Sequence, residues 1–205
     1  MNIINRIRNK YDLYAIRKYK EIDGWLSPNE ALELYRLAAL VPQNGIIVEI
    51  GSWKGKSTYC LAKGVRNGKV FTIDPFDASA EEASAKLYEE KKGNTPLLNQ
   101  FQDTMSTLGV IDKIIILHGY SSQYVNSFQK IDLLFIDGDH SLGGCNYDYD
   151  NFSHYILRGG YIVFHDYNPE RNDLGPTDVV NNKVMKSGRY AFLKQTDSLW
   201  IGQKK

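Results

Sequence analysis

The stretch VEIGSWKGKST, residues 48–58, joins a short apolar run to two glycines and a pair of hydroxyl residues. A strand that enters a glycine-rich turn and then opens a helix places a ligand at the carboxyl end of a sheet, beside the helix N-terminus. Gly51 permits the tight turn, and Gly55 lets the backbone approach a ligand closely. The stretch therefore predicts a ligand-binding turn in an α/β sheet.

The rest of the chain alternates between strand-like and helix-like segments. Continuous apolar runs are typical of strands buried on both faces of a parallel sheet, and they occur at 45–50, 69–74, 113–118, 131–137 and 160–166. Helix-like stretches include 57–65 and 143–157, and RYAFLKQTDSLWIGQ (189–203) predicts two strands around a TDS turn. We expect a single domain, 1–205, with a doubly wound, mostly parallel sheet and an antiparallel C-terminal hairpin at one edge.

Two segments lie outside this alternation. Residues 1–23 form a predicted helical extension, with apolar residues at helical spacing and six basic residues among the first twenty. It is either a terminal helix packed on the domain or a helix that binds a membrane surface or a partner. Residues 76–109 hold about two helices where one crossover helix would suffice, so this insertion is either a solvated helix or a lid. Between them, SPNEALELYRLAAL (27–40) predicts a helix with a capping box at Ser27 and Glu30.

Composition limits the function classes. The chain has 205 residues, with Lys+Arg 25 and Asp+Glu 24, and a net charge of +1 does not attract nucleic acid as a whole. Cys60 and Cys145 match no metal or disulfide spacing and are typical of a reducing compartment. No apolar run approaches the ~18 residues of a membrane helix, and no signal-peptide pattern is visible. We expect a cytoplasmic protein without a membrane span.

The charges around the glycines indicate the ligand. A dinucleotide site would show G-x-G-x-x-G, whereas the spacing here is G-x-x-x-G. Glu49 at the first strand end would repel a diphosphate and suit a cation, and Asp74 at the second strand end can accept both ribose hydroxyls. S-adenosylmethionine is cationic and free of phosphate, so it is the predicted cofactor. Alternatively, Glu49 and Asp74 are only caps in a generic α/β domain.

Five segments carry a family resemblance: GWLSPNEALELYRLA, IVEIGSWKGKST, FTIDPF, LLFIDGDHS and RGGYIVFHDY. Together they resemble the class I S-adenosylmethionine-dependent methyltransferases, and more narrowly the macrocin and novobiocin sugar O-methyltransferases and the cephalosporin-biosynthesis methyltransferase. The resemblance implies a Rossmann-like seven-stranded sheet whose last strand is antiparallel. The cofactor-binding residues that we expect are Glu49, Gly51, Ser52, Gly55, Ser57, Asp74, Gly119, Ser121 and Asp137.

Acidic and imidazole side chains follow the fourth and fifth predicted strands. Carboxylate oxygens gathered at one sheet edge suit Mg²⁺ or a similar divalent ion. The resemblance implies Asp137 and Asp166 as metal ligands, Asp139 as general base and His140 as the alternative base. His165 stands where the relatives have a second acid, so it is either a third ligand, which would suit Mn²⁺, Fe²⁺ or Zn²⁺, or a buried imidazole. Asp139 and His140 have an alternative role as stabilisers of the turn.

These observations predict metal-assisted methylation of a hydroxyl on a small acceptor, either a sugar, a polysaccharide unit or a specialised metabolite. Two further readings stay open: a nucleic-acid or protein methyltransferase, and a cofactor-binding accessory protein without catalysis. Against a nucleic-acid or protein methyltransferase, the sequence shows no broad basic face and no amino-methylation motif. An accessory protein without catalysis would leave the clustered carboxylates unexplained. A nicotinamide-dependent oxidoreductase is disfavoured by the missing third glycine. The apolar stripe of the first helix makes a homo-oligomer a further expectation.

Overall fold

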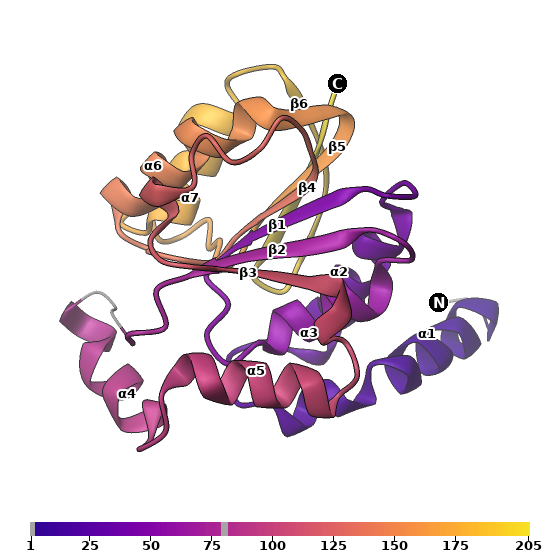
Figure 1. Ribbon diagram of the computed structural model, residues 1–205. Coiled ribbons are helices and arrows are strands. Elements are labelled where there is room, and N and C mark those ends of the chain that lie inside the picture. Colours follow the sequence, from indigo (N-terminus) through magenta and orange to yellow (C-terminus); the bar gives the residue numbers. More distant parts are fainter. Residues whose placement is uncertain (1–2, 79–81) are drawn as a thin grey trace.

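Seven strands form one sheet in the order β3-β2-β1-β4-β5-β7-β6 in the computed structural model, which describes residues 3–78 and 82–205 (Figure 1). The strands are β1 (Ile46–Ile50), β2 (Lys69–Asp74), β3 (Ile114–His118), β4 (Ile131–Ile136), β5 (Ile156–Phe164), β6 (Tyr190–Thr196) and β7 (Leu199–Lys204). Strands β1 to β5 are parallel, and β7 is antiparallel to both β5 and β6. The predicted doubly wound sheet with an antiparallel hairpin at one edge is confirmed.

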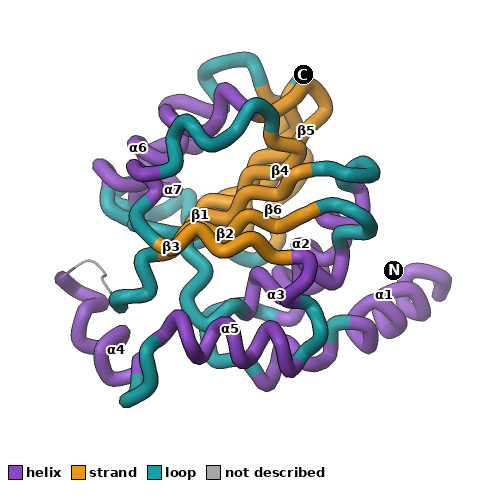
Figure 2. Tube along the Cα trace, in the orientation of Figure 1, coloured by secondary structure: helices purple, strands orange, loops and turns teal. Residues whose placement is uncertain are grey.

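Helices cover both faces of the sheet (Figures 1 and 2). The helices beside the sheet include α1 (Ile3–Ala15), α2 (Pro28–Leu40), α3 (Lys56–Gly64), α5 (Leu97–Thr107) and α6 (Leu142–Phe152). In the view of Figure 1, α6 and the short α7 (Gly175–Val179) lie above the sheet, while α1, α2, α3 and α5 lie below it. Each layer has its own apolar core, since Leu34, Leu61 and Phe101 belong to one buried cluster and Phe152 and Phe164 to the other.

The start of α2 matches the sequence prediction. The Ser27 hydroxyl accepts a hydrogen bond from the Glu30 amide, and the Glu30 carboxylate accepts one from the Ser27 amide at 2.8 Å. Pro28 occupies the first turn, where its missing N–H costs nothing. The predicted capping box is confirmed, and it fixes Glu30 at the end of α2 that faces the sheet's carboxyl edge.

One predicted boundary was wrong. The helix expected over 143–157 ends at Phe152 in α6, and Ile156 already belongs to β5. Gly159, at φ 80°, lies inside β5, and the pairing of β4 with β5 shifts register nearby. A glycine in an irregular strand marks a bulge, which the sequence pattern alone presents as a loop.

The connection between β2 and β3 contains α4 (Glu82–Lys92) and α5. Figure 1 shows α4 beyond the carboxyl end of β2, below and to the left of the sheet. No helix within residues 3–78 and 82–205 has both the length and the apolar character needed to cross a bilayer.

Candidate active site at the carboxyl edge of the sheet

A cavity of about 670 Å³ lies at the carboxyl edge of the sheet. It is lined by residues that follow five strands: 51–53 after β1, 74–75 at the end of β2, 119–122 after β3, 137–141 after β4 and 165–166 after β5. Ligands of open α/β sheets bind at this edge, in pockets of roughly 300–1,000 Å³. Most of the site residues predicted from the sequence line this one cavity.

The two glycines of the first turn have different roles. Gly51, at φ 85°, lines the cavity, and a side chain there would lie 2.2 Å from the carbonyl oxygen of Asp137. Gly51 thus lets the loops after β1 and β4 touch. Gly55 precedes α3 at φ 91°, and a side chain there would meet Phe101 and Met105 of α5 at 2.8 Å. Gly55 allows α3 and α5 to pack closely and does not line the cavity.

Glu49 lies inside the protein instead of at the cavity surface. Its carboxylate accepts hydrogen bonds from the hydroxyls of Ser57 at 2.6 Å, Thr58 at 2.5 Å and Thr72 at 2.9 Å. Complete burial raises the pKa of Glu49 to about 7, although these hydrogen bonds oppose the rise. Glu49 therefore joins β1, β2 and α3, and its charge is not placed to face a ligand directly. Of this group, only Ser57 lines the cavity.

Asp74 ties the first turn to the end of β2. Its Oδ2 accepts hydrogen bonds from the amides of Ser52 and Trp53, both at 2.8 Å, and its Oδ1 accepts one from the Phe76 amide at 2.6 Å. Burial raises the pKa of Asp74, while these amides act in the opposite direction. Asp74 and Ser52 both line the cavity, and the buried Ser52 hydroxyl lies beside the Asp74 carboxylate.

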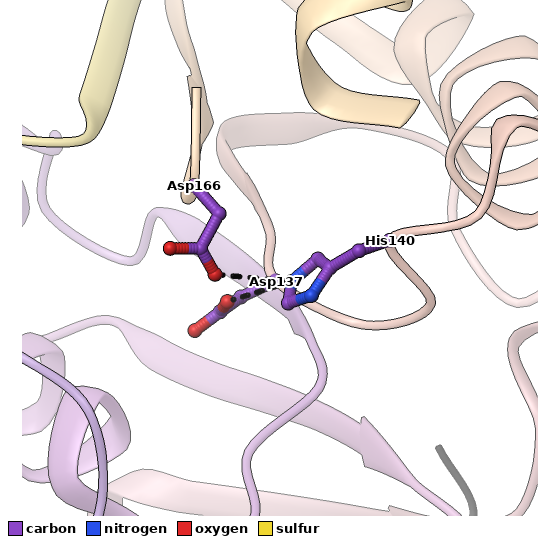
Figure 3. A group of neighbouring side chains, drawn as sticks. All are labelled: Asp137, His140 and Asp166. Carbon is purple, nitrogen blue, oxygen red and sulfur yellow. Dashed lines mark ion pairs between the residues drawn. The ribbon is translucent and has the colours of Figure 1, made fainter. Parts of the chain in front are cut away.

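Asp137, His140 and Asp166 converge at the ends of β4 and β5 (Figure 3). The His140 Nε2 lies 3.5 Å from Asp137 Oδ1 and 3.4 Å from Asp166 Oδ2. One donor atom from each residue lies within 4.8 Å of the other two, which is compatible with a shared cation. Asp166 has a φ of 54°, a left-handed conformation that few residues with side chains adopt and that aspartate tolerates better than most.

His165 lies beside this group and is approached by three carboxylates, because its Nδ1 is also 3.3 Å from Asp166 Oδ2. Its Nδ1 is 2.9 Å from Asp137 Oδ1, and its Nε2 is 3.6 Å from Glu30 Oε2. Burial alone would lower the pKa of His165, but Asp137, Asp166 and Glu30 raise it well above its usual value. The donor atoms that lie within 4.8 Å of one another come from Asp137, His140 and Asp166, so the geometry favours His140 over the predicted His165 as the third ligand.

The neighbouring histidines also affect the protonation of Asp137. Burial would raise the pKa of this carboxyl, yet the imidazoles of His165 and His140 hold it below its ordinary value. Asp137 is thus an anion that two neighbouring rings orient, as the carboxylates of metal sites usually are.

The surroundings of Asp139 are compatible with both predicted roles, general base and stabiliser of the turn. Its Oδ1 accepts a hydrogen bond from the Ser141 amide at 2.8 Å, and Ser141 in turn caps α6 through the Gly144 amide. The side chain is exposed and lines the cavity beside Asp137 and His140. One carboxylate oxygen therefore stabilises the turn, and the residue still borders the space where an acceptor would bind.

The sequence analysis missed Asp148. This residue of α6 is 4 % exposed, lines the cavity and accepts a hydrogen bond from the Ser121 hydroxyl at 2.6 Å. Burial raises the pKa of Asp148 to about 6. The position of Asp148 on its helix could have indicated that it faces the site. It lies one helical turn after Gly144, and Gly144 packs against Asp139. Gly119 and Ser121, both predicted, line the same part of the cavity.

Three aromatic rings complete the cavity wall. Trp25 precedes α2, Trp53 lies in the turn after β1, and Tyr88 belongs to α4. The Tyr88 ring centroid is 4.9 Å from those of both tryptophans, and the Trp53 indole N–H is buried without a hydrogen-bond partner among the described residues. The 76–109 insertion therefore contributes to the cavity through Tyr88.

Comparisons with known proteins show the same fold and a family match. An uncharacterized protein of Acanthamoeba polyphaga mimivirus is 27% identical over 163 residues, which cover 72% of this chain and 63% of that protein. The O-methyltransferase NovP has a similar fold (TM-score 0.66, 15% identity, 87% of this chain and 81% of that chain). The O-methyltransferase TomG from Streptomyces achromogenes, solved with S-adenosylmethionine, is comparable (TM-score 0.64, 16% identity, 96% and 89%). A family model described as a methyltransferase domain matches residues 48–167, more than half of the sequence, and the chain therefore belongs to this methyltransferase family.

Proposed function

We propose that this protein transfers a methyl group from S-adenosylmethionine to a hydroxyl of a small acceptor, either a carbohydrate or a specialised metabolite. One observation carries the proposal: a single cavity joins Asp74 at the end of β2 to Asp137, Asp139 and Asp166 after β4 and β5. The cavity is therefore able to hold a nucleoside beside a group of acids suited to hydroxyl chemistry. The methyltransferase family and the similarity in fold to TomG support the same reaction.

The cofactor would lie over β1, β2 and β3. Asp74 would accept the ribose hydroxyls, the turn at Gly51 and Ser52 would hold the amino-acid part, and Gly119, Ser121 and Asp148 would border the base. The bound cofactor supplies a methyl group on a positively charged sulfur. The role of this chain is to hold that methyl in line with the acceptor oxygen and to exclude water.

The acceptor end carries the acid–base chemistry. The donor set of Asp137, His140 and Asp166 fits a divalent metal, since two carboxylates with one imidazole suit Mn²⁺, Fe²⁺ or Zn²⁺, and Mg²⁺ less well. When bound there, such an ion lowers the pKa of a coordinated hydroxyl. Asp139 takes the hydroxyl proton as general base, and His165 keeps Asp137 ionised and oriented.

Two measurements test the proposal. Titration calorimetry with S-adenosylhomocysteine should show binding by the wild type and weaker binding by Asp74→Ala, while Asp150→Ala, a matched change on the exposed face of α6, should bind normally. Release of S-adenosylhomocysteine is then followed with sugar and phenolic acceptors. Undiminished affinity of Asp74→Ala would contradict the cofactor placement. Cofactor binding without turnover on any acceptor would favour an accessory protein.

A further inference from the structure

Helix α1 presents two different apolar faces. One face is bound to the rest of the protein: Ile16, just after the helix, is fully buried, and Leu13 packs against the core. The Arg36 guanidinium of α2 fixes the same side, because it donates to Asp12 at 2.7 Å and to Asn9 at 2.7 Å. The orientation of α1 on the domain is thus set by both packing and charge.

The other face of α1 points to solvent and is also apolar. Ile7 is 51% exposed, Tyr11 72% and Tyr14 65%. These residues are four and three positions apart, so they form one continuous stripe on the helix. The opposite face of α1 packs against the domain, so packing within the protein does not explain why this exposed stripe is apolar.

Basic residues flank this stripe. Arg8 and Lys10 are exposed on either side of it, and the Arg17 guanidinium lies 4.1 Å from the centroid of the Tyr14 ring. The first twenty residues contain six of the 25 basic residues and only one of the 24 acidic residues, so the rest of the chain is net acidic. The one acid, Asp12, pairs with Arg36 at 2.7 Å on the bound face and lies 3.8 Å from Arg8. Arg8, Lys10 and Arg17 thus place positive charge beside the exposed stripe.

From this arrangement, we propose that α1 docks the protein on an anionic lipid surface, with Ile7, Tyr11 and Tyr14 in the interfacial layer and Arg8, Lys10 and Arg17 against lipid phosphates. Helices that lie in a membrane interface combine a modest apolar stripe with Lys and Arg flanks, and tyrosine prefers the headgroup level. Pairing with a second copy through this face would bring two basic segments together, which charge repulsion opposes.

The position of α1 leaves the active-site cavity open. Figure 1 shows α1 at the lower right, whereas the carboxyl edge of the sheet and α4 lie at the left. Docking through α1 would thus hold the enzyme at a surface without covering the cavity. The inference is independent of the acceptor, and it would stand even if the chemistry differed from the proposed reaction.

Vesicle flotation tests the docking surface. The full-length protein is mixed with vesicles of phosphatidylcholine alone or of phosphatidylcholine with phosphatidylglycerol, at low and high salt. We expect binding only to the anionic vesicles, with affinity that falls as salt rises. Lys10→Gln should weaken binding about fivefold, and Arg8→Gln by a similar factor. Ile7→Ser with Tyr11→Ser should also weaken it, because these changes remove the apolar stripe.

Matched controls separate this surface from others. Lys86→Gln on α4 and Leu193→Ser on β6 alter exposed residues elsewhere and should leave vesicle binding unchanged. Equal loss in the controls, or equal binding to neutral vesicles, would overturn the proposal. So would a wild type that ignores vesicles but binds duplex DNA, or one that forms a dimer lost on Ile7→Ser. The α1 variants should bind S-adenosylhomocysteine as the wild type does, which shows that they are folded.

Discussion

The imidazole Nδ1 of His165 lies 2.9 Å from Oδ1 of Asp137, the same oxygen that lies 3.5 Å from His140 Nε2. The other ring nitrogen faces Glu30 of the α2 capping box at 3.6 Å. The start of α2 is therefore connected through one buried ring to an acid of the candidate metal group. Glu30, which caps α2, is thus linked through His165 to Asp137 of the candidate metal group.

The pair of Glu30 and His165 makes stability depend on pH. Burial would raise the pKa of Glu30, but hydrogen bonds from His165, Ser27 and Ser198 lower it from 4.5 to about 2. A depressed carboxyl pKa stabilises the fold above the unfolded value, and the contribution is lost as the pH falls through the folded value. We expect the wild type to lose about 2 kcal/mol of unfolding free energy between pH 5 and pH 2 from this group, after allowance for solvent screening.

Glu30→Gln isolates this contribution. Urea unfolding at neutral pH should show a variant less stable by about the same amount, with the two proteins converging near pH 2. Glu89→Gln, an exposed carboxylate on α4, serves as the matched control and should follow the wild type at every pH. A constant gap between wild type and Glu30→Gln down to pH 2 would contradict the assignment.

The fold was readable from the sequence because its strands are continuous apolar runs. Parallel strands buried on both faces need no alternating pattern, and Val48, Leu134 and Val163 are fully buried, as such runs predict. The start of β5 near Gly159 could not be predicted from the sequence, because bulges and turns favour the same residue types. The two-sided burial of a ring such as His165 also depends on packing between α2 and β5, which no local pattern encodes.

The sequence predicted which strand ends meet at the cavity, but not the direction of several side chains there. Strand ends fixed where Asp74, Asp137 and Asp166 would meet, because the carboxyl ends of parallel strands share one edge. The direction of individual side chains could not be predicted from the sequence. Glu49 points inward to three hydroxyls, and Asp148 reaches the cavity from α6. Long-range contacts decide such directions, and spacing along the chain does not.

The metal group gives the next prediction. Calorimetry of chelator-treated protein should show Mn²⁺ binding that His140→Ala and Asp166→Asn largely remove, because each loses a donor atom of the group. His165→Gln should weaken binding by a smaller factor, roughly 10–100, as expected for a residue that orients a ligand. EDTA should lower turnover, and a divalent ion should restore it.

Asp150→Asn is a control for this titration, since that carboxylate pairs with Lys183 at the surface. Loss of binding in His165→Gln together with full binding in His140→Ala would reverse the assignment of the two histidines. A wild type that binds no divalent ion and keeps full activity after chelation would remove the metal from the mechanism.

Asp139→Asn tests the general base. The amide oxygen can still accept from the Ser141 amide, so the turn before α6 should persist. Turnover should fall by roughly 10²–10⁴, because an amide cannot take the acceptor's proton, and the affinity for S-adenosylhomocysteine should stay unchanged. Ser141→Ala perturbs the cap of α6 and keeps the base, so it should retain most activity. Wild-type rates in Asp139→Asn would instead assign Asp139 to the turn alone.

Glu49→Gln distinguishes an internal carboxylate from a ligand-binding one. Burial raises the folded pKa of Glu49 to about 7 from 4.5, so the wild type should lose stability as the pH rises between these values, by about 3 kcal/mol. The glutamine variant should lack this slope and be the more stable protein at pH 8, in urea unfolding followed at several pH values. Its affinity for S-adenosylhomocysteine should change little, because Glu49 does not line the cavity, whereas Asp74→Asn at the cavity should bind more weakly. A folded Glu49→Gln protein that no longer binds the cofactor would show that this charge acts on the ligand after all.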